Sequence, residues 1–185
     1  SFDSNGTCNC ANASVGDTAT ISGTTYTVVD NSTIAGQIAN GNVNLCTTLV
    51  TNMTNLFLRN TSFNSSIGFW DTSNVTSFSG MFQGATAFNQ DIGSWNISNA
   101  YTIANMFNEA TSFNNNGQDL NDWNTSGIIT MAAVFGRSAF NQDIGNWNTS
   151  NVTNMRGMFP VTPFNKDISN WNTSSVTDMK LMFYG

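Results

Sequence analysis

One phrase recurs along this chain and limits what the chain can fold into. The stretch AFNQDIGSWNISN at 87–99 returns as AFNQDIGNWNTSN at 139–151 and as PFNKDISNWNTSS at 163–175. Tryptophan holds the same place in each copy and recurs at spacings of 24 to 28 residues: Trp70, Trp95, Trp123, Trp147 and Trp171. A period of this length predicts a repeat architecture, in which each unit buries its apolar edge only against its neighbours.

Other apolar positions keep step with the tryptophans. An apolar residue stands five positions after each Trp, and a Phe stands seven further on, at Phe82, Phe107, Phe135, Phe159 and Phe183. A second Phe follows in each unit, and an earlier unit without Trp fits through Val50 and Phe57. We therefore expect a leucine-rich-repeat-like solenoid of about six repeats of 24–28 residues over 43–185. The longest insertion, 114–122, should bulge from one edge.

Within one unit, two walls can be assigned. DIGSWNI at 91–97 is typical of a short strand, so short parallel strands are expected on one face. NMFNEA at 105–110 and its counterparts predict short helical or 3₁₀ turns on the opposite wall. The Met and Phe side chains then fill the interior. A cofactor pocket is the weaker interpretation of these aromatic columns, because they run the whole length and no polar groups converge on them.

The first 42 residues differ in kind from the repeats. DTATISGTTYTVVD at 17–30 alternates polar and apolar residues around Gly23, which predicts a hairpin. STIAGQIANG at 32–41 predicts a short helix that is capped by Ser32 and ends at Gly41. Because a solenoid needs its open end sealed, we assign residues 1–42 to an N-terminal segment and cap, with a separate binding domain as the alternative.

Composition excludes several classes of function. Only 9% of residues are charged and the net charge is −6, which argues against nucleic-acid binding and against anionic membranes. No apolar run approaches the roughly 20 residues of a membrane span. The chain has no His, which excludes Ser-His-Asp and Cys-His catalysis, and it has no phosphate-binding glycine loop. We expect no enzyme activity, no cofactor and no metal.

One column of carboxylates has three possible roles: metal binding, catalysis or turn formation. Asp91, Asp119, Asp143 and Asp167 hold the same place in successive repeats. Such carboxylates can gather Ca²⁺ or act as general acid and base. A structural role is the simpler interpretation, in which each Asp accepts backbone N–H bonds at a turn. The first unit has Ser66 here, which weakens any site that needs the whole column.

N-x-[ST] sequons are abundant, and they mark surface in a secreted chain. They stand at Asn5, Asn12, Asn31, Asn52, Asn60, Asn64, Asn74, Asn96, Asn124, Asn148, Asn151 and Asn172. Chance alone yields many in a chain so rich in Asn, Ser and Thr. Their register favours a functional role over chance, because four of the sequons directly follow the repeat Trp: Asn96, Asn124, Asn148 and Asn172. If Trp points inward, these four should form one exposed row carrying N-glycans; a coil-to-coil Asn ladder is the unglycosylated alternative.

The motifs FNQDIGSWN, WNTSNVTNMRGMF and WNTSSVTDMKLMF resemble the repeats of the BspA-like surface proteins of bacteria and protists. The resemblance covers about 43–185, and CANASVGDTATISGTTYTVVD with NLCTTLVTNM is similar to the N-terminal cap of some members. The resemblance implies an extracellular, solenoidal protein used for surface display, adhesion or matrix building, without enzyme activity in the repeats. A start at Ser1 without Met fits a secreted product after signal cleavage, or a trimmed chain.

Three cysteines in an oxidising compartment permit one intrachain disulfide. Cys8 and Cys10 are too close to bridge each other comfortably, so either one is expected to pair with Cys46 and clamp the cap to the first coil. The resemblance to the cap points to Cys10 as the partner. Cys8 is then spare, either free or linked to another molecule.

Two functions remain, both non-enzymatic. One is a structural protein that assembles head to tail into a filament, and the other is a monomeric adhesin that binds a protein or glycan through the sheet face. A glycan row on that face favours the filament. LMFYG ends the chain in an uncapped coil, and SFDSN at the start resembles SFNSS at 62–66. We therefore expect Phe2 of one copy to dock on the last coil of the next, although the chain could also be a fragment of a longer repeat protein. The docking residues on that coil are Val176, Met179, Met182 and Phe183.

Overall fold

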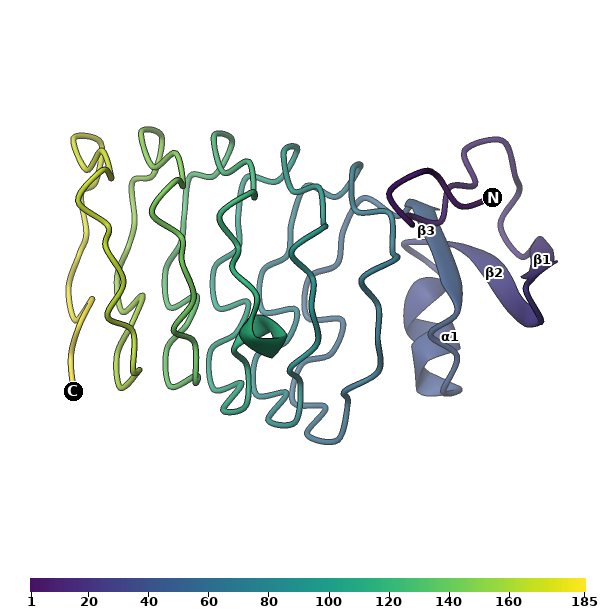
Figure 1. Ribbon diagram of the computed structural model, residues 1–185, viewed down its shortest axis with the longest axis horizontal. Coiled ribbons are helices and arrows are strands. Elements are labelled where there is room, and N and C mark those ends of the chain that lie inside the picture. Colours follow the sequence, from purple (N-terminus) through teal and green to yellow (C-terminus); the bar gives the residue numbers. More distant parts are fainter.

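The computed structural model describes every residue, Ser1–Gly185. It has two parts, which follow one another along the long axis (Figure 1). Residues 1–49 form a cap with three strands and one helix, and the rest of the chain winds into a row of stacked coils. The two termini lie at opposite ends of the molecule, so the cap closes one end and the final coil forms the other.

The cap is built on a three-stranded sheet in the order β1-β2-β3. β1 (Thr18–Ile21) and β2 (Thr24–Asp30) form an antiparallel hairpin that turns at Gly23, whose φ is 82°. This confirms the hairpin prediction. β3 (Leu45–Leu49) pairs with β2 in parallel and leads directly into the first coil. The boundary suggested between residues 42 and 43 therefore falls within the cap, in the loop between α1 and β3.

Helix α1 (Ile34–Ala39) connects β2 to β3. Its N-cap is Thr33 rather than the predicted Ser32, whose hydroxyl instead donates to the Asp30 carboxylate at 2.8 Å. That carboxylate accepts the backbone N–H groups of Ser32 and Thr33, at 3.0 and 3.1 Å, and so fixes the turn that leads into the helix. The helix ends before Gly41, as predicted, because the φ of 79° there suits glycine.

Six coils follow, joined by a column of single-residue parallel bridges: Asn52, Ser77, Thr102, Thr130, Asn154 and Asp178. Next to this column lies what we call the turn wall, residues 53–60 and their equivalents in each coil. Along it, each coil donates four backbone N–H groups to carbonyls of the following coil. In the first pair, for example, Phe57 donates to Met81 at 2.8 Å. Every second residue donates in this way, and the residues between them bond within their own coil.

The coils hold no extended strand, which corrects the prediction for 91–97. Residues there form a turn, in which the Trp95 N–H donates to the Ile92 carbonyl at 3.1 Å. The Asp91 carboxylate accepts the N–H of Gly93 at 2.9 Å, and this local bond favours a turn over a ladder. The turn wall also differs from the predicted helical or 3₁₀ turn, because left-handed residues recur there at every fourth position, such as Asn105 with a φ of 58°.

Aromatic rings fill the interior as columns. Within one coil the ring centroids of Phe82 and Phe88 lie 3.9 Å apart, and Phe82 stacks on Phe107 of the next coil at 5.7 Å. All five tryptophans are buried. The indole N–H of Trp70 donates to the Val43 carbonyl of the cap, and the other four donate to a carbonyl of the preceding coil, for example from Trp147 to Leu120 at 2.8 Å. The inward register predicted for Trp is confirmed.

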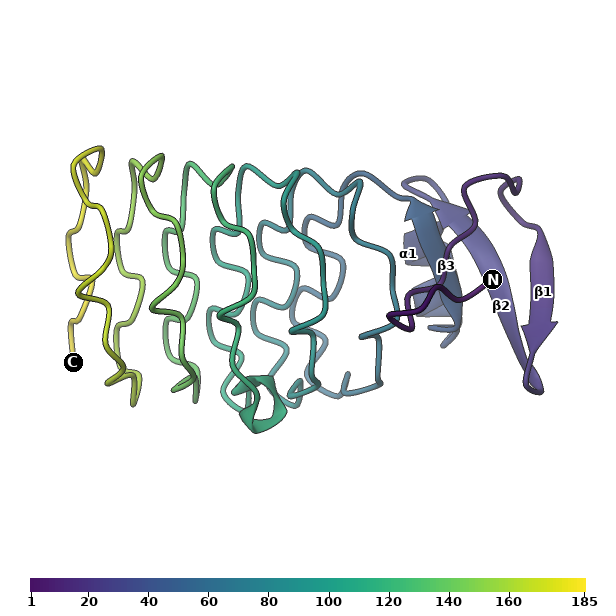
Figure 2. The same cartoon turned by 45° about the horizontal axis from the view of Figure 1, so that its top comes forward.

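The insertion at 114–122 carries the 3₁₀ turn η1 (Asn115–Gly117), which lies at one edge of the stack (Figure 2). Asn115 is completely buried. Its side-chain oxygen accepts the Ile92 N–H at 2.9 Å, and its amide donates to the carbonyls of Gln118 and Asp119. One buried side chain therefore satisfies the backbone groups that the longer loop would leave unpaired.

Candidate functional site

The four asparagines that follow the repeat tryptophans form an exposed row with one member in each coil. We call Asn96, Asn124, Asn148 and Asn172 the post-Trp asparagines; all four are exposed, as predicted, although turns rather than strands present them. The side-chain oxygen of each accepts the N–H of the Ser two positions on, at 3.0–3.2 Å. No amide nitrogen of this row makes a hydrogen bond, so all four nitrogens face solvent.

The first coil breaks this row. Its equivalent residue is Asp71, which keeps the same turn by accepting the N–H and the hydroxyl of Ser73, at 3.1 and 2.6 Å. Asp71 is only 6% exposed, and it shares a small polar pocket with residues of the N-terminal loop, including Asp3, Asn5 and Asn9. The one buried position of the row is thus the one without a sequon.

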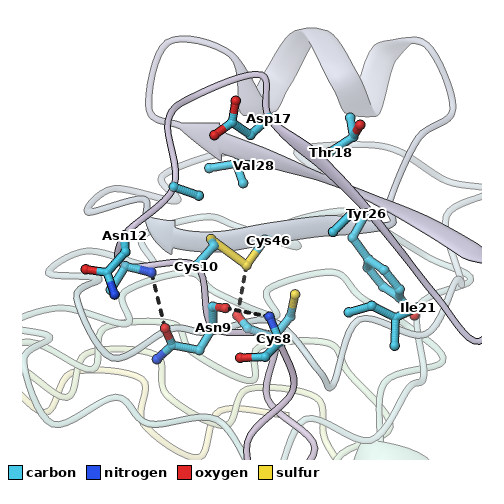
Figure 3. A pocket seen from close by; sticks show the side chains of 14 residues that line it. Cys8, Asn9, Cys10, Asn12, Asp17, Thr18, Ile21, Tyr26, Val28 and Cys46 are labelled. Atoms are coloured by element: carbon cyan, nitrogen blue, oxygen red, sulfur yellow. Dashed lines mark hydrogen bonds between the residues drawn. A yellow bond between two sulfur atoms is a disulfide. The ribbon is translucent and has the colours of Figure 1, made fainter.

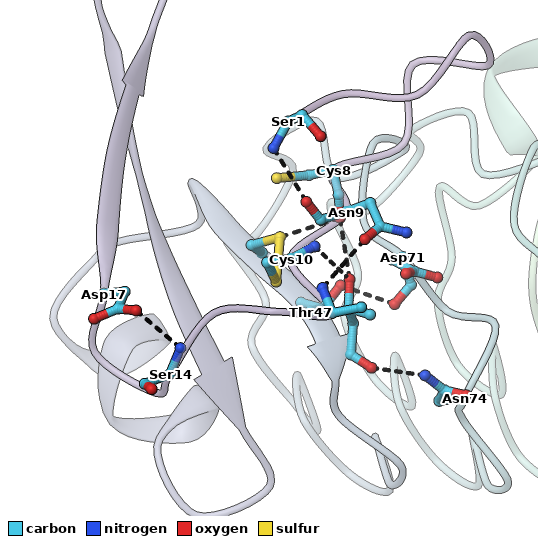
Figure 4. Close-up of a disulfide and its surroundings, with 12 residues drawn as sticks. Ser1, Cys8, Asn9, Cys10, Ser14, Asp17, Thr47, Asp71 and Asn74 are labelled. Atoms are coloured by element: carbon cyan, nitrogen blue, oxygen red, sulfur yellow. Dashed lines mark hydrogen bonds between the residues drawn. A yellow bond between two sulfur atoms is a disulfide. The ribbon is translucent and has the colours of Figure 1, made fainter.

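A second set of asparagines braces neighbouring coils. Asn74, Asn99 and Asn151, the bracing asparagines, each donate a side-chain N–H to a backbone carbonyl of the preceding layer, at 2.8, 2.7 and 2.8 Å. For Asn99 and Asn151 that layer is the preceding coil, whereas the bond from Asn74 ties the first coil to β3 of the cap (Figure 4). Asn74 and Asn151 are sequon residues, so two predicted glycosylation sites have amide nitrogens already in use.

A third set forms a continuous ladder. These ladder asparagines directly follow the second Phe of each unit: Asn64, Asn89, Asn114, Asn141 and Asn165. The side-chain oxygen of each accepts the backbone N–H of the next, at 2.8–3.1 Å. The Asn ladder that the sequence offered as an alternative therefore exists, but in this column and not after Trp. Its sequon member, Asn64, has its oxygen engaged.

The remaining sequons lie in or near the cap. Asn31 is fully engaged: its amide donates to the Thr51 hydroxyl at 2.8 Å, and its oxygen accepts the N–H groups of Thr51 and Asn52. It joins the cap to the first coil. Asn5, Asn12 and Asn52 are exposed, and Asn60 is half-buried.

The aspartate column serves the turns. Asp91, Asp119, Asp143 and Asp167 each accept the N–H of the residue two positions on, at 2.9–3.1 Å, which confirms the structural role. The bond from the Ser169 N–H stabilises the charged carboxylate and holds the pKa of Asp167 below its ordinary value. No three His, Cys, Asp or Glu side chains are grouped to hold a metal ion.

Cys10 and Cys46 form the disulfide, with their Cα atoms 6.2 Å apart, so the pairing implied by the resemblance is confirmed (Figure 4). The bond ties the N-terminal segment to β3. Cys8 is the spare cysteine; it is 2% exposed, and burial raises the pKa of its thiol. A buried, protonated thiol is poorly placed to link a second molecule.

A cavity of about 500 Å³ opens beside the disulfide (Figure 3). Its walls come from the cap alone and include Cys8, Tyr26 and Ile21, with Asp17 at its rim. Of the predicted site residues, Cys10, Cys46 and the sequon residue Asn12 line it.

Phe2 packs within its own cap in this chain, and its docking on a second copy stays a prediction. Phe2 packs edge-on against Tyr26, with ring centroids 5.1 Å apart, and lies 6.1 Å from Phe69. It also forms an antiparallel bridge with Cys8, whose N–H donates to the Phe69 carbonyl. Phe2 is thus held by its own cap, because the apolar side of the hairpin offers it a nearby aromatic partner.

The final coil keeps the other predicted docking residues together. Met179 and Phe183 are 41% and 59% exposed, Val176 is half-buried, and Met182 is buried. On the turn wall of this coil, the N–H groups of Met179, Leu181, Phe183 and Gly185 have no acceptor, whereas their equivalents in every earlier coil donate to the next coil. The exposed face therefore combines free donors with apolar side chains.

Comparison with known proteins leads to one family. Residues 26–119 and 114–185 match the family described as "Mycoplasma protein of unknown function, DUF285", a repeat family related to BspA-like surface repeats. No curated protein and no solved structure matches the chain. No helix here is long and apolar enough to cross a membrane. Since the two matches together span most of the sequence, the chain belongs to the DUF285 family.

Proposed function

We propose that this chain is an extracellular, BspA-like structural repeat protein without enzyme activity, whose leucine-rich-repeat-like solenoid joins head to tail with further copies into a filament. The observation that carries the proposal is the row of free N–H donors at Met179, Leu181, Phe183 and Gly185. Donors that recur at every second residue match the unpaired groups of a strand edge, which recur with the same period.

The cap offers such an edge at the opposite end of the molecule. β1 pairs only with β2, so its other side is free. Charge favours the same contact. The only charged side chains among the first 58 residues are the acidic ones of Asp3, Asp17 and Asp30. The last two coils hold three basic residues, Arg156, Lys166 and Lys180, and two acidic ones, Asp167 and Asp178, so their side chains carry a small net positive charge. This modest complementarity favours a contact between the cap of one copy and the final coil of the next.

Electron microscopy of matched variants tests the proposal. Leu181→Glu puts a charge on the final coil at a side chain that is 54% exposed, and Ile129→Glu puts it on the flank of the fourth coil at one that is 49% exposed. We expect filaments from the unmodified chain and from Ile129→Glu, and monomers from Leu181→Glu. Circular dichroism checks that both variants fold.

The adhesin is the competing function. A chain that stays monomeric at high concentration and low salt would contradict the filament and favour the adhesin. An intact native protein heavier than these 185 residues and their modifications would also contradict it, because chain beyond them would then be available to cover the final coil.

A further inference from the structure

We propose that the post-Trp asparagines are the preferred N-glycan attachment sites of this chain, and that the fold keeps glycans off the bracing asparagines. The inference rests on the proposed extracellular location but not on filament formation. In the modification, the Asn Nδ2 bonds to the anomeric carbon of a diphosphate-activated oligosaccharide. The bond from that carbon to the phosphate oxygen breaks, the diphosphate leaves with the electron pair, and Nδ2 gives up one proton.

Solvent access is the first argument. Each post-Trp asparagine is exposed, and its amide nitrogen has no hydrogen-bond partner. The side-chain oxygen is held by the Ser that completes the sequon; Ser126 and Ser150 use both N–H and hydroxyl, with hydroxyl distances of 2.7 and 2.8 Å. Holding the oxygen inward turns the nitrogen outward, where a glycan meets only water.

The second argument comes from the sequons whose amide nitrogens are already hydrogen-bonded within the fold. Asn74 directs its nitrogen at β3 of the cap and Asn151 at the preceding coil, each 2.8 Å from a carbonyl oxygen. Asn31 uses both its nitrogen and its oxygen to join the cap to the first coil. A glycan on any of these three nitrogens competes with a bond between neighbouring coils, so the folded protein tolerates it poorly.

The third argument is the exception in the row. Asp71 occupies the post-Trp position of the first coil, where residues 3–9 lie against it. Asp keeps the turn bonds to Ser73 but has no amide nitrogen to accept a sugar. The chain thus retains the turn and loses the sequon at the one buried position of the row.

The full chain, secreted from a eukaryotic cell, provides the test. Enzymatic deglycosylation in ¹⁸O water converts each glycosylated Asn to an ¹⁸O-labelled Asp. Mass spectrometry of the peptides then shows which asparagines carried a glycan. Asn148→Gln and Asn151→Gln form a matched pair three residues apart on one coil. We expect Asn148→Gln to remove one glycan and Asn151→Gln to leave the glycan mass unchanged. Bare asparagines at all four post-Trp positions, or equal losses in the two variants, would overturn the inference.

Asp71→Asn makes a sharper variant, because it creates the sequon Asn-Thr-Ser found at 124–126 and 148–150. We expect position 71 to be bare in secreted, folded protein, and any glycan there to be confined to retained, misfolded chains. A secreted monomer carrying a glycan at 71 as often as at Asn124 would contradict the role of the fold. Enzymatically deglycosylated protein can still be imaged, so a failure here is separable from a failure of filament formation.

Discussion

The cap and the coils are stabilised in different ways. The cap has ordinary secondary structure, with three paired strands and a helix, and one disulfide holds it closed. The coils have none of this beyond single bridges and η1, yet they bury nearly all of the core. Their stability comes from four backbone hydrogen bonds between each pair of neighbouring turn walls, from stacked aromatic columns and from the asparagine ladder. The comparison teaches that a repeat can hold its coils together without extended strands, provided that every coil contributes to each of these columns.

Removing one tryptophan should have the largest effect on the coils. Trp147→Ala deletes a ring that is 2% exposed and is stacked on Trp123 and Trp171, and it also leaves the Leu120 carbonyl without its donor. We expect a loss of about 3–5 kcal/mol in the free energy of unfolding, measured in urea. Tyr101→Ala, at an exposed position of the third coil, is the control. Equal losses in the two variants would mean that the column carries no special weight.

Breaking the disulfide should act on the cap alone. Cys10→Ser removes the link to Cys46, which closes a loop with a sequence separation of 36, and a loss of about 2–4 kcal/mol is expected for such a loop. Amide exchange should speed up in β1 and β2 and stay unchanged in the coils. Cys8→Ala leaves the disulfide intact and should change exchange little. Faster exchange throughout the coils would refute the separation of the two parts.

The asparagine columns allow a comparison within one coil. Asn141→Ala removes the acceptor of the Asn165 N–H, a bond between coils, and we expect a loss of about 1 kcal/mol. Asn148→Ala removes bonds only within its own turn, so its loss should stay within about 0.5 kcal/mol. Thermal unfolding of unglycosylated protein measures both. A larger loss from Asn148→Ala would show that the post-Trp row is structural.

The smallest expected effect is on the pKa values of two carboxylates, one in the cap and one in the coils. Both have pKa values below 3.8 in the fold, Asp30 chiefly through the Ser32 hydroxyl and Asp167 chiefly through the Ser169 N–H. Their contributions to stability are therefore present above pH 3.8 and are lost as the pH falls through the lowered pKa. In carboxyl NMR titrations, Ser32→Ala should raise the pKa of Asp30 more than Ser169→Ala raises that of Asp167. The opposite order would contradict this assignment of causes.

The sequence alone predicted the features that repeat with the period of the coils. The buried tryptophans, the turn aspartates and the exposed post-Trp row all follow from positions that repeat in phase, because the same environment recurs in each coil. The hairpin at Gly23 follows from local alternation. The pairing of Cys10 came from a resemblance to known caps, since spacing alone left Cys8 open.

The rest depended on contacts that no local pattern reveals. The prediction of a strand at 91–97 was wrong because the Gly93 N–H bonds to the Asp91 carboxylate two residues earlier. This local bond favours a turn, whatever the spacing of the apolar residues. The sequence did not show which asparagine column forms the ladder. The post-Trp, bracing and ladder columns all consist of Asn and differ only in the backbone groups that lie next to them. The packing of Phe2 inside its own cap was not predicted, because its partners there, Tyr26 and Phe69, are distant in sequence. The recurrence of Asn after the second Phe, from Asn64 to Asn165, was the available signal for the ladder.

The one-way donation along the turn wall has an electrostatic consequence. Four N–H groups of each coil point toward the following coil along the turn wall, whereas two backbone N–H groups elsewhere in the coil, such as those of Thr153 to Ile129 and of Asn141 to Asn114, point back. The peptide dipoles of the wall therefore add along the stack, with the positive end at the final coil. This polarity is the reverse of an α-helix, whose N-terminus is positive. Each added coil lengthens the dipole, so stacks of this kind should align in an electric field with their caps toward the positive electrode.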